Sequence, residues 1–95
     1  MQDDAFEWDD VKAARNRLHH HVSFEMAREV FKDLFAVEWT DDNQDSGEDR
    51  FVTVGMADGR RLFVSHTLRG ERIRIISARL AESYERRRYH NEDQT

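Results

Sequence analysis

The segment 71–79 combines the clearest strand pattern of the chain with its densest line of cations. Arg72 and Arg74 alternate with Ile73 and Ile75, so a strand here places guanidinium groups on one face and isoleucines on the other. A guanidinium group binds phosphate oxygens through two parallel N–H donors. The pattern therefore predicts a strand that packs on the core with one face and binds phosphate with the other. A solvated edge strand is the alternative.

The second half of this strand is less clear. If the strand stays regular to its end, the pleat places Ser77 and Arg79 on the isoleucine side. Ile76 and Ala78 then fall on the arginine side, so the alternation of charged and apolar residues holds only for the first half.

Histidine is the natural group for proton transfer near neutral pH, and the candidates are His66 and His20. His66 ends a predicted strand in the arginine-rich half and could lie beside Arg72 or Arg74 on a neighbouring strand, so we favour it. Lys12 and His20 lie eight residues apart on one predicted helix, and they point within about 80° of each other at 3.6 residues per turn. For either histidine alone, a structural hydrogen-bonding role is equally plausible.

The run His19, His20 and His21 suggests a metal site, but adjacent helical residues point about 100° apart and do not converge on one ion. Only a carboxylate from the second helix, Glu25 or Glu29, would complete such a site. We therefore expect neither a metal nor another cofactor. The chain contains no cysteine, which excludes disulfides and thiolate metal sites. Weaker acid–base candidates are Glu7, Glu48 and Tyr89.

Charge is distributed unevenly along the chain. Residues 1–49 hold 5 Lys and Arg against 14 Asp and Glu, whereas residues 50–90 hold 10 Arg against 4 acids, within a net charge of -5. Such asymmetry predicts a basic surface that meets phosphates, flanked by acidic elements.

Apolar periodicity and turn signals predict the elements in chain order. Strands are expected at 5–8, 35–39, 51–54, 62–66 and 71–79, and helices at 12–20, from 24 onward, and at 81–89. Asp9 or Asp10 caps the first helix and Ser23 the second, and Asp58-Gly59 joins two strands in a hairpin. The sequence thus predicts an α+β domain with a mostly antiparallel sheet of about four to five strands, two N-terminal helices and a C-terminal helix.

Two helices carry predicted apolar stripes. The stripes are Val11, Ala14 and Leu18 on the first helix, and Phe24, Ala27, Val30 and Phe31 on the second. The residues 40–49 form a long acidic loop. The C-terminal run 85–88 is read as a solvated face, a surface that docks a partner protein or part of a nucleic-acid groove.

With 95 residues the chain is expected to be a single domain, 1–95, whose residues 91–95 form a disordered tail. Neither a signal peptide nor an apolar run of membrane-spanning length is present in the sequence. We therefore expect a cytoplasmic protein that does not contact a membrane.

An ordered set of residues resembles the BrnT toxin family. The set is Phe6, Glu7, Trp8, Asp9, Lys12, Ala13, Asn16, His20, Val22, Ser23, Phe24, Glu25, Ala27, Arg50, Phe51, Gly55, the segment 72–79, Glu85, Arg86 and Tyr89. Where the family usually has Lys-His-Gly before Val-Ser-Phe, this chain has His19-His20-His21, so His21 stands where glycine would close the helix.

The resemblance implies a ribonuclease toxin of a type II toxin–antitoxin pair, with a RelE-like, microbial-ribonuclease-like fold. It also implies inhibition by a BrnA-type antitoxin, which would make any contact with operator DNA in place of this chain.

Our hypothesis is a metal-independent RNA endonuclease. Arg72, Arg74 and Arg79 bind the phosphate, His66 or His20 transfers the proton, and Lys12 adds positive charge. The alternative is a non-catalytic interaction module, or an inactive toxin, whose basic face binds a partner protein or RNA.

Overall fold

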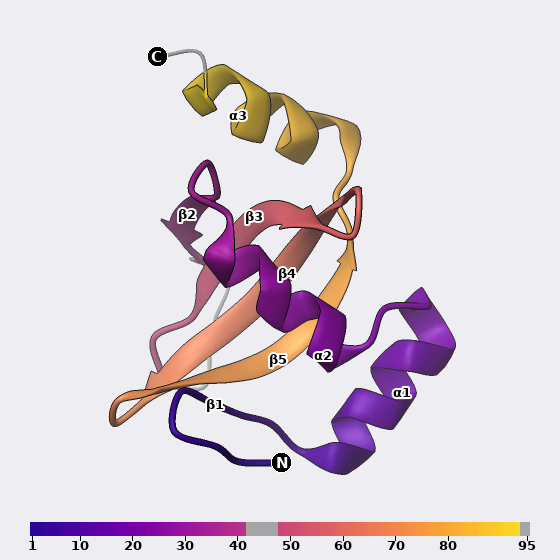
Figure 1. The fold of residues 1–95 in the computed structure, drawn as a ribbon, viewed down its shortest axis with the longest axis vertical. Coiled ribbons are helices and arrows are strands. Elements are labelled where there is room, and N and C mark those ends of the chain that lie inside the picture. Colours follow the sequence, from indigo (N-terminus) through magenta and orange to yellow (C-terminus); the bar gives the residue numbers. More distant parts are fainter. Residues whose placement is uncertain (42–47, 94–95) are drawn as a thin grey trace.

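Five strands form one sheet in the spatial order β1-β5-β4-β3-β2 (Figure 1). This computed structural model describes residues 1–41 and 48–93. The strands are β1 (Phe6–Glu7), β2 (Val37–Thr40), β3 (Phe51–Ala57), β4 (Arg60–Arg69) and β5 (Arg72–Leu80). The helices are α1 (Asp10–His20), α2 (Phe24–Ala27) and α3 (Ser83–Asp93), and the 3-10 segment η1 (Arg28–Lys32) continues α2.

β1 pairs in parallel with β5, and the other neighbouring strands of the sheet are antiparallel. The predicted α+β class is confirmed. The predicted turn between β3 and β4 is also confirmed: Asp58 and Gly59 both have positive φ, 51° and 76°, as a tight hairpin turn requires.

Asp9, one of the two predicted caps, caps helix α1, because its carboxylate accepts hydrogen bonds from the backbone N–H groups of Val11 and Lys12. The helix therefore begins at Asp10, two residues earlier than predicted. The expected apolar stripe is wrong, however, since Val11 is 60% and Leu18 79% exposed. Helix α1 instead turns Ala13 and Asn16 towards the protein.

Asn16 fastens α1 to the outer edge of β5. Its side-chain amide donates to the carbonyls of Val22 (2.9 Å) and Ala78 (2.8 Å), and its oxygen accepts the Ala78 N–H at 3.1 Å. The amide thus binds both backbone groups of Ala78, as a neighbouring strand would. This is why a buried polar residue, rather than an apolar stripe, fixes the position of α1.

The second helical segment packs across the sheet. Ser23 caps α2 as predicted, but one α-helical turn gives way to η1. Phe24, Ala27 and Val30 are fully buried. A Cβ atom at Gly55 would lie 3.0 Å from Val30 Cβ, so glycine at this position lets η1 lie directly on β3.

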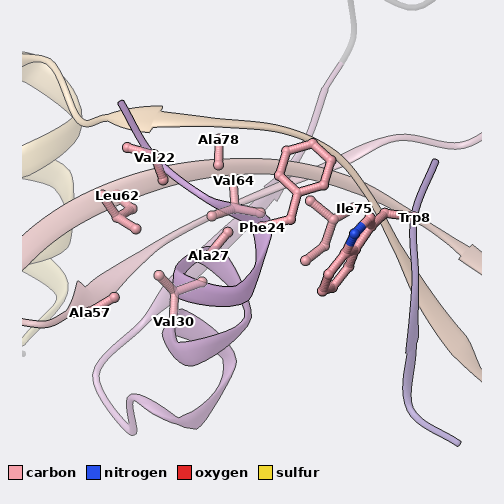
Figure 2. Packing of buried hydrophobic residues seen from close by; sticks show 10 residues of the cluster. All are labelled: Trp8, Val22, Phe24, Ala27, Val30, Ala57, Leu62, Val64, Ile75 and Ala78. Atoms are coloured by element: carbon pink, nitrogen blue, oxygen red, sulfur yellow. The ribbon is translucent and has the colours of Figure 1, made fainter. Parts of the chain in front are cut away.

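These residues belong to the main core, on one side of the sheet (Figure 2). We call this side the core face. Its members are Trp8, Val22, Phe24, Ala27, Val30, Ala57, Leu62, Val64, Ile75 and Ala78. Full burial of a side chain such as Leu62 or Phe24 stabilises the fold by roughly 1.5–3 kcal/mol.

A second, smaller core lies where α3 packs on the opposite side of the sheet, over β2 and β3. It contains Val37, Val52, Val54, Ala81 and Tyr89. Asp33 holds this region together: its carboxylate accepts hydrogen bonds from the Tyr89 hydroxyl and the Met56 N–H, both at 2.8 Å.

The starts of β2 and α3 differ from their predicted positions because of local hydrogen bonds. Asp33 also accepts the Phe35 N–H, which holds a turn there, so β2 starts at Val37 and Phe35 is 59% exposed. The Ala81 N–H donates to the Arg61 carbonyl, so α3 starts two residues later than predicted and runs to Asp93, past the expected start of the tail. Of the predicted acidic loop, residues 42–47 lie outside the described residues, as do residues 94–95 of the tail.

Candidate functional site

An irregularity in β5 decides which of its side chains share a face. Ser65 lies opposite Ser77, whereas the next residue, His66, lies opposite Ile75. Ile76 is therefore the extra residue of a β-bulge, and the alternation of side chains shifts by one position after it.

The bulge places Arg79 on the same face as the other two arginines, which corrects the expectation for a regular strand. Ala78 is buried in the same cluster as Ile75. Arg79 lies opposite Phe63, and its guanidinium carbon is 4.0 Å from the centre of that ring. We call the side that carries Arg72, Arg74 and Arg79, opposite α2 and η1, the arginine face.

Each of these three arginines has a partner within the chain. Arg72 donates from Nε to the Asp3 carbonyl at 2.7 Å. Arg74 is paired with Glu7 of β1 at 2.6 Å, with side chains only 26% and 15% exposed. The predicted phosphate ligands are thus fixed in place, and their remaining N–H donors are what a phosphate could use.

Arg79 is the most constrained of the three. Its two terminal nitrogens donate to the two carboxylate oxygens of Glu85, at 2.8 and 2.9 Å. The Glu85 side chain is fully buried. Burial would raise the pKa of Glu85, but the hydrogen bonds from Arg79 and the Glu82 N–H outweigh it and lower that pKa. The pair joins β5 to α3, so Arg79 has a clear structural role.

His66 lies on the strand next to Arg74, as expected, but on the opposite face. It is 3% exposed on the core face, and its ring packs edge-on against Phe31 with centroids 4.9 Å apart. Its Nε2 is 2.9 Å from the Thr53 hydroxyl and 3.5 Å from Glu38. Burial lowers the pKa of His66, and the charge of Glu38 opposes this only in part. The geometry that favoured His66, a place beside the arginines, is not found.

Lys12 and His20 are brought together beside the bulge. They line a cavity of about 200 Å³, which we call the α1–β5 groove, with Arg15, Asn16, His19 and Ile76. The other flank of α1, with Ala13 and Arg17, faces Ser23 and Phe24 at the start of α2. The groove therefore opens on the flank of α1 turned away from α2.

Asp9 links this groove to the arginine face. Its pKa is lowered first by the hydrogen bond from the Lys12 N–H and further by the charges of Lys12 and Arg74. Both cations therefore lie near the cap of α1. Lys12 and Arg15 supply positive charge, His19 and His20 supply imidazole rings with centroids 6.4 Å apart, and no carboxylate is among the described residues that line the groove. Such a groove can bind an anion and exchange protons with it.

Sequence reasoning missed three contributors to this region. Asn16 gave no signal, because a polar residue between two arginines reads as exposed. Arg15 and His19 follow from the helical spacing that already grouped Lys12 with His20, since they lie on the same flank. Glu7 was only a weak candidate, although it lies in register with Arg74.

The other weak candidates have structural partners. Glu48 is paired with Arg69 at 2.9 Å, and Tyr89 bonds to Asp33. Within residues 1–41 and 48–93, no three His, Asp or Glu side chains are gathered closely enough to hold a metal ion. In the same part of the chain, no helix has both the length and the apolar character needed to span a membrane.

Fold and site together define a small α+β protein with a cation-rich, histidine-bearing groove at the edge of a mostly antiparallel sheet. The family model described as the ribonuclease toxin BrnT of type II toxin–antitoxin systems matches residues 8–85. The chain belongs to this family, which confirms the resemblance seen in its residues. No curated protein matches the chain. Family membership makes it a ribonuclease toxin, with RNA as substrate and an antitoxin as partner.

Proposed function

We propose that this toxin cleaves RNA without a metal ion, by acid–base catalysis in the α1–β5 groove, in the cytoplasm, and that a BrnA-type antitoxin neutralises it. The observation that carries the proposal is the gathering of Lys12, Arg15, His19 and His20 in one groove next to Arg74. Cations and imidazole rings are the groups that metal-independent phosphodiester cleavage requires.

The reaction assigns a task to each group. The RNA 2′-oxygen attacks the neighbouring phosphorus while a base removes its proton, and the bond to the 5′-oxygen breaks as an acid protonates that oxygen. His20 performs one of these transfers, and His19, whose ring centre lies 6.4 Å from that of His20, is the candidate for the other. Lys12 and Arg74 stabilise the negative charge that builds up on the phosphorane oxygens.

Glu7 positions Arg74 in this scheme. Its carboxylate holds one terminal nitrogen of Arg74 at 2.6 Å, which leaves the other N–H donors of the guanidinium for phosphate. Arg72 and Arg79 contribute to the field of the arginine face while they fasten β5 to the N-terminal segment and to α3.

The competing function is binding without cleavage. It is supported by the fact that all three arginines of β5 already have partners within the chain, as a purely structural face would. Growth distinguishes the two, because a binding module does not degrade cellular RNA.

The test is induction of the chain in a bacterial host, with growth and total RNA integrity as readouts. The parent is expected to arrest growth and degrade RNA, and co-expression of a BrnA-type antitoxin to restore growth. Lys12→Ala combined with His20→Ala is expected to remove toxicity, whereas the control Lys32→Ala, at an exposed cation paired with Glu29, keeps it. Soluble, folded parent that leaves growth and RNA unchanged would contradict the proposal.

A further inference from the structure

A second group of cations lies at the other end of β5, where the chain enters α3 (Figure 1). A cavity of about 430 Å³ is lined there by Arg61, Ser83, Arg86, Arg87 and His90. Arg61 is the second residue of β4, and the others are on α3. The Ala81 N–H donates to the Arg61 carbonyl, which holds the two elements together at this point.

The arginines of this cavity differ from four others in the chain. Arg28, Arg69, Arg74 and Arg79 each form an ion pair with a carboxylate. Among the side chains of residues 1–41 and 48–90, no carboxylate lies within ion-pair distance of Arg61, Arg86 or Arg87. Like charges held close together repel one another, so three such guanidinium groups lining one cavity form a site for an anion.

Two of these arginines are held in place by uncharged groups. Arg86 donates to the Ala81 carbonyl at 2.6 Å and to the Ser83 hydroxyl at 3.1 Å. The guanidinium of Arg61 lies over the Tyr89 ring, 6.0 Å from its centre. These contacts orient the side chains without neutralising them and leave N–H donors available.

The lining favours a phosphodiester over an acidic protein. Protein interfaces gain most of their affinity from buried aromatic residues and arginines, and among the described residues that line the cavity there is no Trp, Tyr or Phe. The planar guanidinium group of arginine donates two parallel hydrogen bonds, which fit two phosphate oxygens.

The distance between the two sites suits a single strand of RNA. Between Arg74 and Ala81 the strand rise gives a span of roughly 20 Å, along which Ser77 and Arg79 face the same side. That distance accommodates several nucleotides of a single strand.

We propose that the cavity of Arg61, Arg86, Arg87 and His90 is a second RNA-backbone site, which holds phosphates of the strand that is cleaved in the α1–β5 groove. The inference rests on the proposed function for its substrate, and it adds a binding site outside the cleavage groove. The toxin then contacts an extended single strand, and short RNA does not reach both sites.

Fluorescence anisotropy of labelled RNA tests this in a chain that carries Lys12→Ala and His20→Ala to prevent cleavage. The probes are a trinucleotide and a strand of about 16 nucleotides, the upper range for a single-strand-binding groove. Arg61→Gln with Arg87→Gln is compared with Arg17→Gln with Arg69→Gln, which removes the same charge elsewhere. Circular dichroism confirms that each variant is folded.

We expect the first pair to weaken binding of the long strand about tenfold and to reduce the salt slope by about 1.4, or about 0.7 for each lost phosphate contact. The trinucleotide, which occupies only one site at a time, should lose less affinity than the long strand, and the control pair should have less effect. The proposal would be overturned if the two pairs of substitutions weakened binding of the long strand equally. It would also be overturned if the first pair weakened binding of the trinucleotide and of the long strand equally. Unchanged RNA binding with loss of antitoxin binding would assign the cavity to the protein partner instead.

The two proposals fail separately. If the parent chain does not cleave RNA but the length-dependent loss is found, the second site stands and the cleavage mechanism falls. If the parent cleaves RNA but the long strand binds equally to both pairs of variants, the cleavage mechanism stands and the second site falls.

Discussion

Titratable groups lie in opposite environments on the two faces of the sheet. On the core face, His66 is enclosed by Phe31 and Phe51 with a hydroxyl group as its close partner. On the arginine face, one residue away in register, Arg74 is paired with Glu7 and stays partly exposed. The first environment favours an uncharged ring, and the second keeps a fixed charge near solvent.

This difference shows that residue type and strand adjacency do not make a site. A strand places neighbouring side chains on opposite faces, so His66 and the arginines of β5 cannot act on one phosphate. The groups that accompany the arginines come instead from α1, which Asn16 binds to the edge of β5.

The largest expected effect concerns the carboxylate of Glu85, which is fully buried. Glu85→Gln removes the buried negative charge that Arg79 binds and turns an NH2 group towards one of its two terminal nitrogens. We expect a loss of about 2–3 kcal/mol in the free energy of unfolding, measured in urea. The control Glu82→Gln, at a side chain 64% exposed, should cost less than about 0.5 kcal/mol. Similar losses for the two variants would show that burial does not distinguish them.

Substitution of Arg74, which is paired with Glu7 on the arginine face, is expected to affect RNA cleavage more than stability. Arg74→Gln should lower the rate of RNA cleavage about 100-fold, the scale for removing one donor to a developing charge. Arg72→Gln removes a side chain that donates a hydrogen bond to the Asp3 carbonyl, and it should lower the rate much less. Steady-state cleavage of a labelled strand measures both rates, and equal rates for the two variants would contradict the role given to Arg74.

His21 closes α1 in a left-handed conformation, with φ at 57° and ψ at 30°. A residue with a Cβ atom is strained there by roughly 1 kcal/mol relative to glycine. His21→Gly should therefore raise the free energy of unfolding by about 1 kcal/mol and leave cleavage intact, since His21 does not line the α1–β5 groove. Thermal and urea unfolding measure the gain, and a destabilised variant would contradict this explanation.

The smallest expected effect is a pH dependence from the core face. Burial lowers the pKa of His66 in the folded chain, so the unfolded chain binds more protons once the pH falls below about 6.5. The contribution of His66 is thus fully present above that pH and is lost progressively below it. His66→Gln should show a shallower decline in unfolding free energy between pH 6.5 and 5, whereas identical slopes would mean that His66 does not titrate differently in the two states.

The sequence was most informative where local rules act alone. Asp9 and Ser23 cap helices through their own side chains, and Asp58 with Gly59 forms a turn that needs no distant partner. The bulge at Ile76 was not predictable, because it is defined by how β5 pairs with β4, a strand formed by other residues.

The face of His66 could have been predicted. His66 is in phase with Leu62 and Val64, and alternating apolar residues mark the core side of a strand. The role of Asn16 could not, since its three hydrogen bonds link positions up to 62 residues apart.

The most direct test of the central claim is cleavage of labelled RNA by the purified chain, freed of any bound partner and assayed in EDTA. The parent, His20→Ala, His19→Ala and His66→Gln are compared at equal folded concentration. The α1–β5 groove predicts that the parent cleaves, that His20→Ala is slowed about 100-fold, and that His66→Gln differs little from the parent. Loss of cleavage in His66→Gln with full activity in His20→Ala, or an inactive parent, would contradict it.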